Sequence, residues 1–174
     1  SSAEVAAGFN DDDDFEYIEL RNIGDEVLDL SNVRFTKGID ADLSGTIAPG
    51  AFIVVVRNQA AFEMRYGTGI PVAGEFTGKL DNGGERIKLS FGAGIAIQDF
   101  IYDDSSPWPD TPDGNGQSLV IVHPRSLPDH TNSFSWRSGN PTPGSSDGTL
   151  FPGGDLVAYA LQGQPNLQVI DDSF

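Results

Sequence analysis

The sequence predicts an all-β protein, and three observations support this. Short runs rich in Val, Ile, Phe and Leu recur along the chain, and many alternate apolar with polar residues. Glycine-containing turns separate these runs, most clearly at residues 48–50, 81–84, 113–116 and 141–144. The chain also holds 21 Gly and 11 Pro, which is heavy for a helical protein and natural for a turn-rich β protein. Turns at this spacing favour antiparallel strands over helices or βαβ units.

About nine short strands are predicted, a number typical of a sandwich of two sheets. In the first, Ile18 and Leu20 point to one face and Tyr17 and Glu19 to the other. The predicted strands are residues 15–22, 27–30, 33–37, 51–57, 76–80, 85–91, 96–102, 117–123 and 134–136. The side chains expected in the core are Val54, Val56, Ile87, Leu89, Leu119 and Ile121.

Three local patterns carry more detail. Residues 52–56 are apolar on both faces, which predicts a central strand covered on both sides. Residues 58–66 are the one helical candidate, because Asn58 can cap the start and Gly67 can end it. This short helix is expected to connect the two sheets. The turn at 81–84 predicts a hairpin between the strands on either side of it.

A set of short motifs stands in order along the chain. They are residues 15–22 (FEYIELRN), 28–31 (LDLS), 45–50 (GTIAPG), 80–85 (LDNGGE), 98–102 (QDFIY), 108–109 (WP), 113–114 (DG), 118–119 (SL) and 142–144 (TPG). The ordered set resembles the lamin-tail domain. The resemblance implies an immunoglobulin-like β-sandwich of about nine short strands with one short connecting helix, which is all-β.

The resemblance also implies a division of the chain. Residues 1–9 are expected to be an N-terminal arm or the remnant of a first strand, residues 10–148 the sandwich, and residues 149–174 a linker or tail toward a following domain. Lamin-tail domains usually carry an apolar strand before the equivalent of residues 15–22, where this chain offers only Val5 and Phe9. The edge left open is expected to recruit a strand.

The segment Leu167–Gln168–Val169–Ile170 is the candidate to complete that edge. Pairing within one chain would close the sheet, and pairing between chains would make a strand-swapped homodimer. The sequence leaves both arrangements open.

The formal net charge is −16, from 10 Lys and Arg against 26 Asp and Glu. A surface this acidic repels phosphate backbones and anionic membranes, so no nucleic-acid partner is expected. No apolar run approaches the length of a membrane span, so no membrane insertion is expected. The partners that fit the charge are cations, basic protein patches and neutral glycans, although the charge can also serve solubility alone.

Clustered aspartates are the candidates for a metal site. Asp12 and Asp14 lie in one acidic run, and the stretch 99–113 contains no Lys or Arg. Calcium takes about six to eight oxygen ligands, so it is the ion that these loops could hold. The second group of candidates is Asp103, Asp104, Asp110 and Asp113. Solvated loop acids and an Asp-Gly turn are the alternative, and no other cofactor is expected.

No catalytic residues are predicted. Ser118 and His123 have opposite parity on one predicted strand, so a triad with Asp113 is not expected. Many carboxylates are present, and no pair stands out as a glycosidase pair. Trp108, between two prolines, is the candidate ligand-facing aromatic because it could stack on a sugar. A Trp there more often plugs the open end of a sandwich.

The resemblance therefore implies a non-catalytic structural, adhesion or protein-interaction module of a larger bacterial secreted or cell-surface protein. The expected location is extracellular or at the bacterial cell surface. A calcium-stabilised or glycan-binding accessory module attached to an enzyme is the alternative. A small hydrolase is a third and weaker hypothesis. The sequence does not identify the protein or glycan partner.

Overall fold

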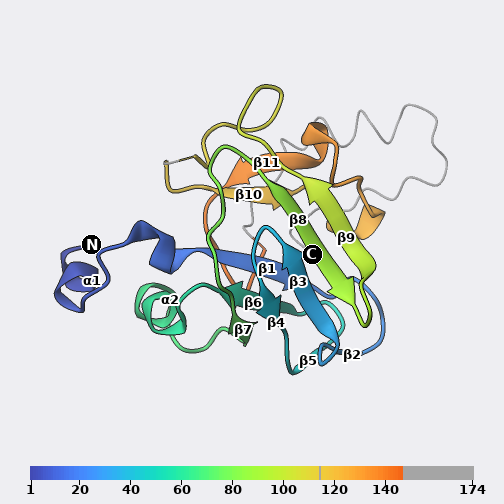
Figure 1. Ribbon diagram of the computed structural model, residues 1–174, viewed down its shortest axis with the longest axis horizontal. Coiled ribbons are helices and arrows are strands. Elements are labelled where there is room, and N and C mark those ends of the chain that lie inside the picture. The colour runs from blue at the N-terminus through green and yellow to red at the C-terminus, as the bar shows by residue number, and fades with distance from the viewer. Residues whose placement is uncertain (114, 147–174) are drawn as a thin grey trace.

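The computed structural model describes residues 1–113 and 115–146 (Figure 1). These residues form eleven strands in four sheets, two α-helices and three short 3-10 helices, so the predicted β-rich class is confirmed. The proposed tail at residues 149–174 and the candidate strand Leu167–Ile170 lie outside the described residues. No helix in the described part is long and apolar enough to cross a membrane.

The elements follow one another with short connections. The helices are α1 (Ser2–Ala6) and α2 (Gln59–Tyr66), with 3-10 helices at Asp12–Phe15, Pro124–Ser126 and Ser133–Ser135. The strands are β1 (Tyr17–Arg21), β2 (Leu28–Asp29), β3 (Val33–Lys37), β4 (Ala41–Asp42), β5 (Thr46–Ile47), β6 (Phe52–Val56), β7 (Val72–Glu75), β8 (Arg86–Phe91), β9 (Ile95–Ile101), β10 (Ser118–Ile121) and β11 (Trp136–Gly139).

Two larger sheets share one buried core. One has the order β1–β6–β7 and the other the order β4–β3–β8–β9, while β2–β5 and β10–β11 form two-stranded sheets. Apolar side chains of both larger sheets meet in a single cluster, because each sheet buries only one of its faces there. The cluster includes Val33, Phe35, Ile53, Val55, Ala73, Ile87 and Leu89.

The strand β6 is the best predicted element. Ile53 and Val55 belong to the core between the sheets, whereas Val54 and Val56 pack against Phe62 of α2. The strand is therefore covered on both sides, as its continuous apolar run predicts. The helix α2 is also confirmed, with the Asn58 side chain accepting from the Ala61 amide at 3.2 Å and Gly67 at its end.

The connection made by α2 differs from the prediction. The helix joins β6 to β7, which are parallel neighbours in the same sheet, and it does not connect the two sheets. Parallel neighbours cannot be joined by a tight turn, so a crossover such as α2 is needed.

The hairpin predicted around residues 81–84 is wrong. The turn itself forms, with the Gly84 amide donating to the Asp81 carbonyl at 3.1 Å, but residues 76–80 are not one of the strands. The preceding strand β7 pairs with β6, while β8 pairs with β3 and β9, so the turn leads from one sheet to the other. The Glu16 carboxylate accepts from the Leu80 amide at 3.0 Å and holds this crossing in place.

The predicted core is correct for four residues and wrong for two. Val54, Val56, Ile87 and Leu89 are buried, whereas Leu119 and Ile121 are only half-buried. Those two lie on β10, which pairs only with β11 and stands outside the two larger sheets. The strand predicted at residues 134–136 begins at Trp136 and continues to Gly139.

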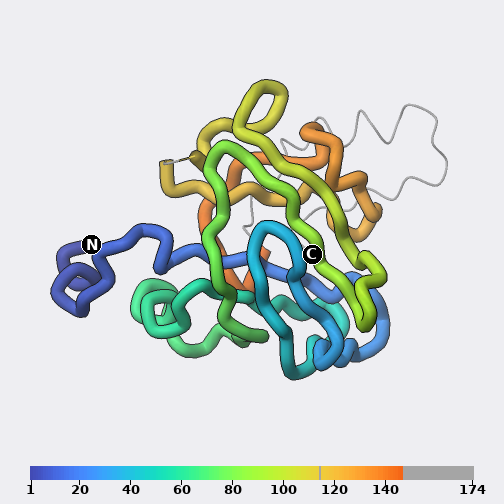
Figure 2. Tube along the Cα trace, viewed as in Figure 1, coloured from blue at the N-terminus to red at the C-terminus, as the bar shows by residue number. Residues whose placement is uncertain are grey.

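The N-terminal residues form the helix α1 and not a strand. Figure 2 shows this stretch extending to one side of the molecule beyond α2. A contact with α2 anchors it, since Arg65 Nε lies 2.8 Å from Glu4 Oε1. The Arg65 guanidinium also lies 3.3 Å from the centre of the Phe15 ring, and this ring contacts Phe9 edge-on.

Candidate functional site

An aromatic cluster joins the strand β9 to the loop between β10 and β11. The Phe100 ring centre lies 5.3 Å from the rings of both His130 and Trp136. The Trp136 Nε1 donates to the His130 carbonyl at 2.9 Å, and burial lowers the pKa of His130. Because these rings come from both segments, they fix the loop on the inner side of the sheet edge.

Residues 122–135, hereafter the 122–135 loop, are held by their own hydrogen bonds. Asp129 Oδ1 accepts from the amide and the hydroxyl of Thr131, at 2.9 and 2.7 Å, and these bonds lower the pKa of Asp129. The Asn132 side chain accepts from the Phe134 amide at 3.1 Å. The Val122 amide closes the base by donating to the Ser135 carbonyl at 2.7 Å. The loop therefore has a defined shape.

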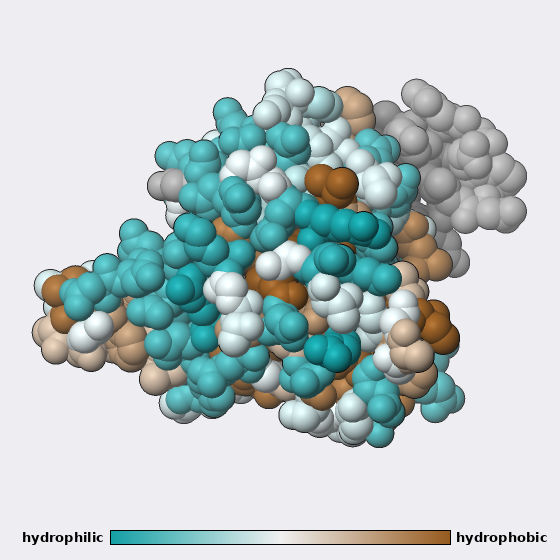
Figure 3. All heavy atoms as spheres, viewed as in Figure 1, coloured by the Kyte–Doolittle hydropathy of each residue, from teal (hydrophilic) through white to brown (hydrophobic). Residues whose placement is uncertain are grey.

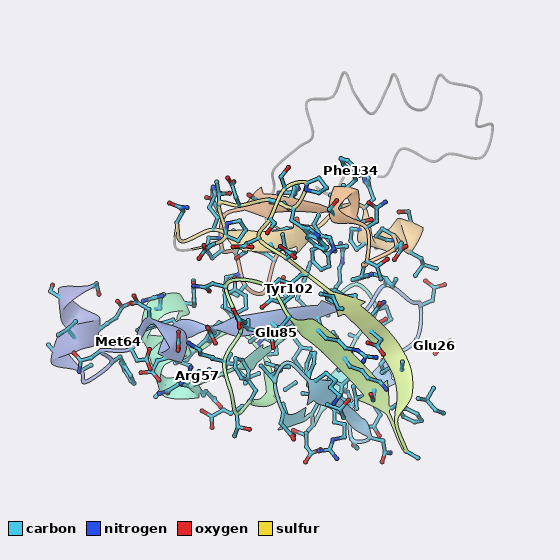
Figure 4. All side chains as sticks on the ribbon, turned by 45° about the horizontal axis from the view of Figure 1, so that its top comes forward. Glu26, Arg57, Met64, Glu85, Tyr102 and Phe134 are labelled. Carbon is cyan, nitrogen blue, oxygen red and sulfur yellow. The ribbon has the colours of Figure 1, made fainter. Side chains whose placement is uncertain are left out.

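Two large apolar side chains project from this loop. Leu127 is 74% exposed and Phe134 is 79% exposed. Figure 4 shows Phe134 at the outer margin of the molecule, away from the two larger sheets. Leu127 has a φ of 54°, a left-handed conformation that costs a non-glycine residue roughly 1–2 kcal/mol. His123 shares this conformation, with a φ of 51°. Backbone strain of this kind concentrates at functional sites.

A second exposed surface lies on β9, the edge strand of its sheet. We call the outward-facing residues Arg86, Lys88, Ile97, Asp99 and Ile101 the β9 surface. Ile101 is 60% exposed, and Ile95 at the start of the strand is 70% exposed. Figure 3 shows hydrophobic areas near both ends of β9 on a face that is otherwise mostly hydrophilic.

Charged groups lie in the middle of the β9 surface. Arg86 binds Asp99 through two hydrogen bonds of 2.7 and 2.8 Å, and this contact lowers the pKa of Asp99. A shallow open depression runs from this pair over Phe100 and Ile101 to Thr131 of the 122–135 loop. The β9 surface and the loop are thus neighbours.

The acidic run Asp11–Asp14 near the N-terminus makes ion pairs and hydrogen bonds with neighbouring side chains. Its residues form a 3-10 helix, and Arg57 lies 3.1 Å from Asp13 and 3.9 Å from Asp11. Asp14 accepts from the Asn58 side chain at 3.4 Å, and Asp12 is exposed. These contacts give the run a structural role at the start of β1.

The second group of predicted calcium ligands does not converge. Asp103 accepts from the Ser105 amide at 2.6 Å and Asp104 from the Ser105 hydroxyl at 3.2 Å, while Asp110 and Asp113 are exposed. Within residues 1–113 and 115–146, no three His, Asp or Glu side chains are grouped so that they could hold a metal ion. Calcium binding stays a prediction.

Trp108 is half-buried, and its ring centre lies 6.3 Å from that of Trp136. This packing against the aromatic cluster favours the structural role over the sugar platform, and sugar binding also stays a prediction.

Sequence reasoning missed three residues. Leu127 lies in a stretch without an expected element, and Phe134 was expected in a strand. Glu19 was expected only on the face opposite Ile18 and Leu20, with no role. In the structure burial raises its pKa to about 7, and it accepts from the Gly144 amide at 2.5 Å. No local signal marks Glu19, because the segment that covers it comes from the other end of the described chain.

Comparison of the chain with protein-family models, with curated proteins and with solved structures finds no match. Its function is therefore inferred from the chemistry of the 122–135 loop.

Proposed function

We propose that this chain is a non-catalytic protein-interaction module of lamin-tail type, an immunoglobulin-like sandwich in a larger bacterial secreted or cell-surface protein. The carrying observation is the pair Leu127 and Phe134, both about three-quarters exposed on one strained and hydrogen-bonded loop. Apolar groups held outward on a fixed backbone bind a partner with little loss of conformational entropy. A loop needed only as a connection gains nothing from the left-handed leucine.

The chemistry of the partner follows from the loop and the total charge. Phe134 and Leu127 would each enter an apolar pocket, as anchors at the centre of an interface do. The −16 charge favours a pocket with a basic rim and disfavours nucleic acid. A protein with a basic-rimmed apolar groove is therefore the partner that fits.

The family part of the proposal has its own support. The two larger sheets share one core, as the layers of a sandwich do. The first and last motifs of the resemblance are also in contact, since Glu19 accepts from Gly144. Both observations support a domain that begins near residue 10 and includes Gly144.

Affinity capture tests the proposed function. The full chain is immobilised and exposed to extracts and medium of the producing cells, and captured proteins are quantified by mass spectrometry. The double variant Leu127→Ser, Phe134→Ser is expected to capture the partner at least about tenfold less, because it removes both anchors. Val5→Ser, which removes an exposed apolar side chain from α1, is the matched control.

The capture should also weaken as salt rises, since opposite charges guide the two proteins together. Equal capture by wild type and double variant would contradict the assignment of the loop. A hydrolytic activity of the full chain that the double variant loses would contradict the non-catalytic role.

A further inference from the structure

The strand β9 is the last strand of its sheet, and it pairs with β8 on one side only. The Tyr102 amide donates to the Glu85 carbonyl at 3.1 Å, so these residues form a hydrogen-bonded pair of the β8–β9 ladder. Such pairs alternate along antiparallel strands, so Asp99 and Ile101 direct their backbone N–H and C=O groups to the open side. No other strand of the described part pairs there. Open edges of this kind recruit strands.

The side chains at this edge define what can dock. Ile97 and Ile101 are exposed, so the docking strand must present apolar side chains. Lys88 is paired across the sheet with Lys37 on β3 and with Asp99 on β9. Two lysines opposite one another repel, and both oxygens of Asp99 are already bound by Arg86. Within the described residues no salt bridge of 4 Å or less includes Lys37 or Lys88, and the charge of Lys88 acts on Asp99 only at longer range. An incoming carboxylate would therefore be stabilised by these two lysines.

We propose that the segment Leu167–Asp172 of the same chain pairs with the free edge of β9. The segment reads LQVIDD, so Leu167 and Val169 lie on either side of Gln168, Ile170 follows, and two aspartates end the segment. The apolar part matches the isoleucines, and the aspartates match the cations of the β9 surface. The 28 residues from Asp147 onward contain four Asp and no Lys or Arg, so an electropositive patch attracts them.

The reach of the chain permits this pairing. Residues 147–166 span up to about 65 Å when extended, at roughly 3.3 Å per residue. A domain of this size has a diameter of roughly 40 Å. The segment can therefore arrive at any face of the domain. Once paired, it removes an exposed edge that would otherwise promote association between copies of the chain. The β9 edge adjoins the 122–135 loop at Thr131. The docking uses the backbone of β9 and not Leu127 or Phe134, so it does not depend on the proposed function.

Introduced cysteines test the docking directly, because the full chain contains no native cysteine. Ile101→Cys is combined with Leu167→Cys or with Val169→Cys, and disulfide formation is followed by intact mass and peptide mapping at micromolar protein under mild oxidation. The control pair is Ile101→Cys with Val157→Cys, from another apolar stretch of the same tail. We expect an intramolecular disulfide to form at least tenfold faster in one of the test pairs than in the control.

Hydrogen exchange supplies a second readout that needs no cysteine. In the full chain, the amides of Asp99 and Ile101 should exchange at least tenfold faster in Val169→Asp than in the wild type or in Val157→Asp. Lys88→Glu should also slow the disulfide formation. Equal cross-linking of test and control pairs, together with unchanged exchange, would overturn the proposal. A cross-link found only between two chains would overturn docking within one chain and indicate a swapped dimer.

Discussion

Glu19 lies on β1, with its carboxylate turned toward the segment that follows β11. Burial raises its pKa to about 7, although the Gly144 amide and the charge of Arg21 oppose the shift. The ordinary value is 4.5, so the folded chain binds this proton more tightly than the unfolded chain. The stability from Glu19 is thus full below about pH 4.5 and is lost as the pH rises through 7.

The variant Glu19→Gln should remove this pH dependence, because a glutamine keeps an acceptor for Gly144 without a charge to bury. At pH 8 the variant should be more stable than the wild type by roughly 1–2 kcal/mol, less than the full shift implies because solvent reaches the half-buried group. At pH 5 the difference should be much smaller. Urea unfolding at both values measures it, with the exposed Glu26→Gln as control (Figure 4). A constant difference between the two pH values would contradict the assignment.

Gly84 is a residue whose missing side chain matters. A Cβ there would lie 2.4 Å from the Tyr102 carbonyl oxygen and 2.7 Å from the Asp103 Cα, and its φ is 102°. Figure 4 shows Tyr102 near Glu85, where its hydroxyl lies 3.3 Å from the Glu85 carboxylate. The strand that continues from β9 therefore passes directly over this glycine.

Gly84→Ala should destabilise the domain by about 2–4 kcal/mol, since both the conformation and the close backbone are unfavourable. Gly92→Ala is the matched control, because Gly92 also has a positive φ, 56°, but no atom within 4 Å of a built Cβ. Its cost should be only about 1 kcal/mol. Chemical denaturation of both variants gives the comparison. Equal costs would show that the Tyr102 contact does not matter.

At the scale of elements, β6 organises the molecule. It pairs antiparallel with β1 and parallel with β7, and its two faces serve two separate apolar clusters. The helix α2 covers the face away from the second sheet, where Phe62 contacts Tyr17 at 5.5 Å and Tyr66 at 5.0 Å between ring centres. A defect in β6 therefore affects both layers.

Val54→Asp tests the central place of this strand. Val54 has no exposed surface, so the variant buries an unpaired charge among the side chains of α2. The cost should exceed about 4 kcal/mol, which is close to the whole stability of a small domain. Loss of the cooperative melting transition in circular dichroism is the expected result. Val27→Asp, at an exposed position, should melt like the wild type. A wild-type melting temperature for Val54→Asp would refute the assignment of this face.

At the scale of the whole molecule, the excess of acid opposes compaction. The chain carries −16, and the ion pairs of the described part lie largely at the surface, where each contributes little. Raising NaCl from about 20 to 500 mM should therefore stabilise the domain by about 1 kcal/mol, because screening reduces the net repulsion between the acidic groups. The melting temperature should rise by a few degrees.

Calcium chloride at matched ionic strength separates screening from a specific site. If screening alone acts, calcium and sodium should raise the melting temperature equally. A further rise with millimolar calcium would support the calcium-stabilised alternative. The described aspartates are not grouped into a set that could hold a metal ion, so no further rise is expected. A fall in melting temperature with NaCl would instead show that the surface ion pairs outweigh the net charge.

The elements that the sequence predicted correctly are those with local causes. The apolar run of β6 and the caps of α2 depend on residues that are close in sequence, so the sequence alone predicts them. For the same reason the turn at 81–84 was predicted, as were the inward positions of Ile87 and Leu89. The acidic loops were also visible, although the contacts of Arg57 with Asp11 and Asp13 were not.

Tertiary structure alone decided which strands are partners and which side chains are covered. The strand β7 pairs with β6 through a crossover, so the turn at 81–84 leads into the other sheet instead of closing a hairpin between β7 and β8. No local sequence pattern distinguishes these two pairings of β7. Glu19 is partly buried because the distant segment around Gly144 covers it. Leu127 and Phe134 are exposed because no distant segment of the described chain covers them. By itself, the sequence determined a turn-rich acidic β protein. The fold determined its candidate interaction surface, since exposure is set by neighbours that only the folded chain brings together.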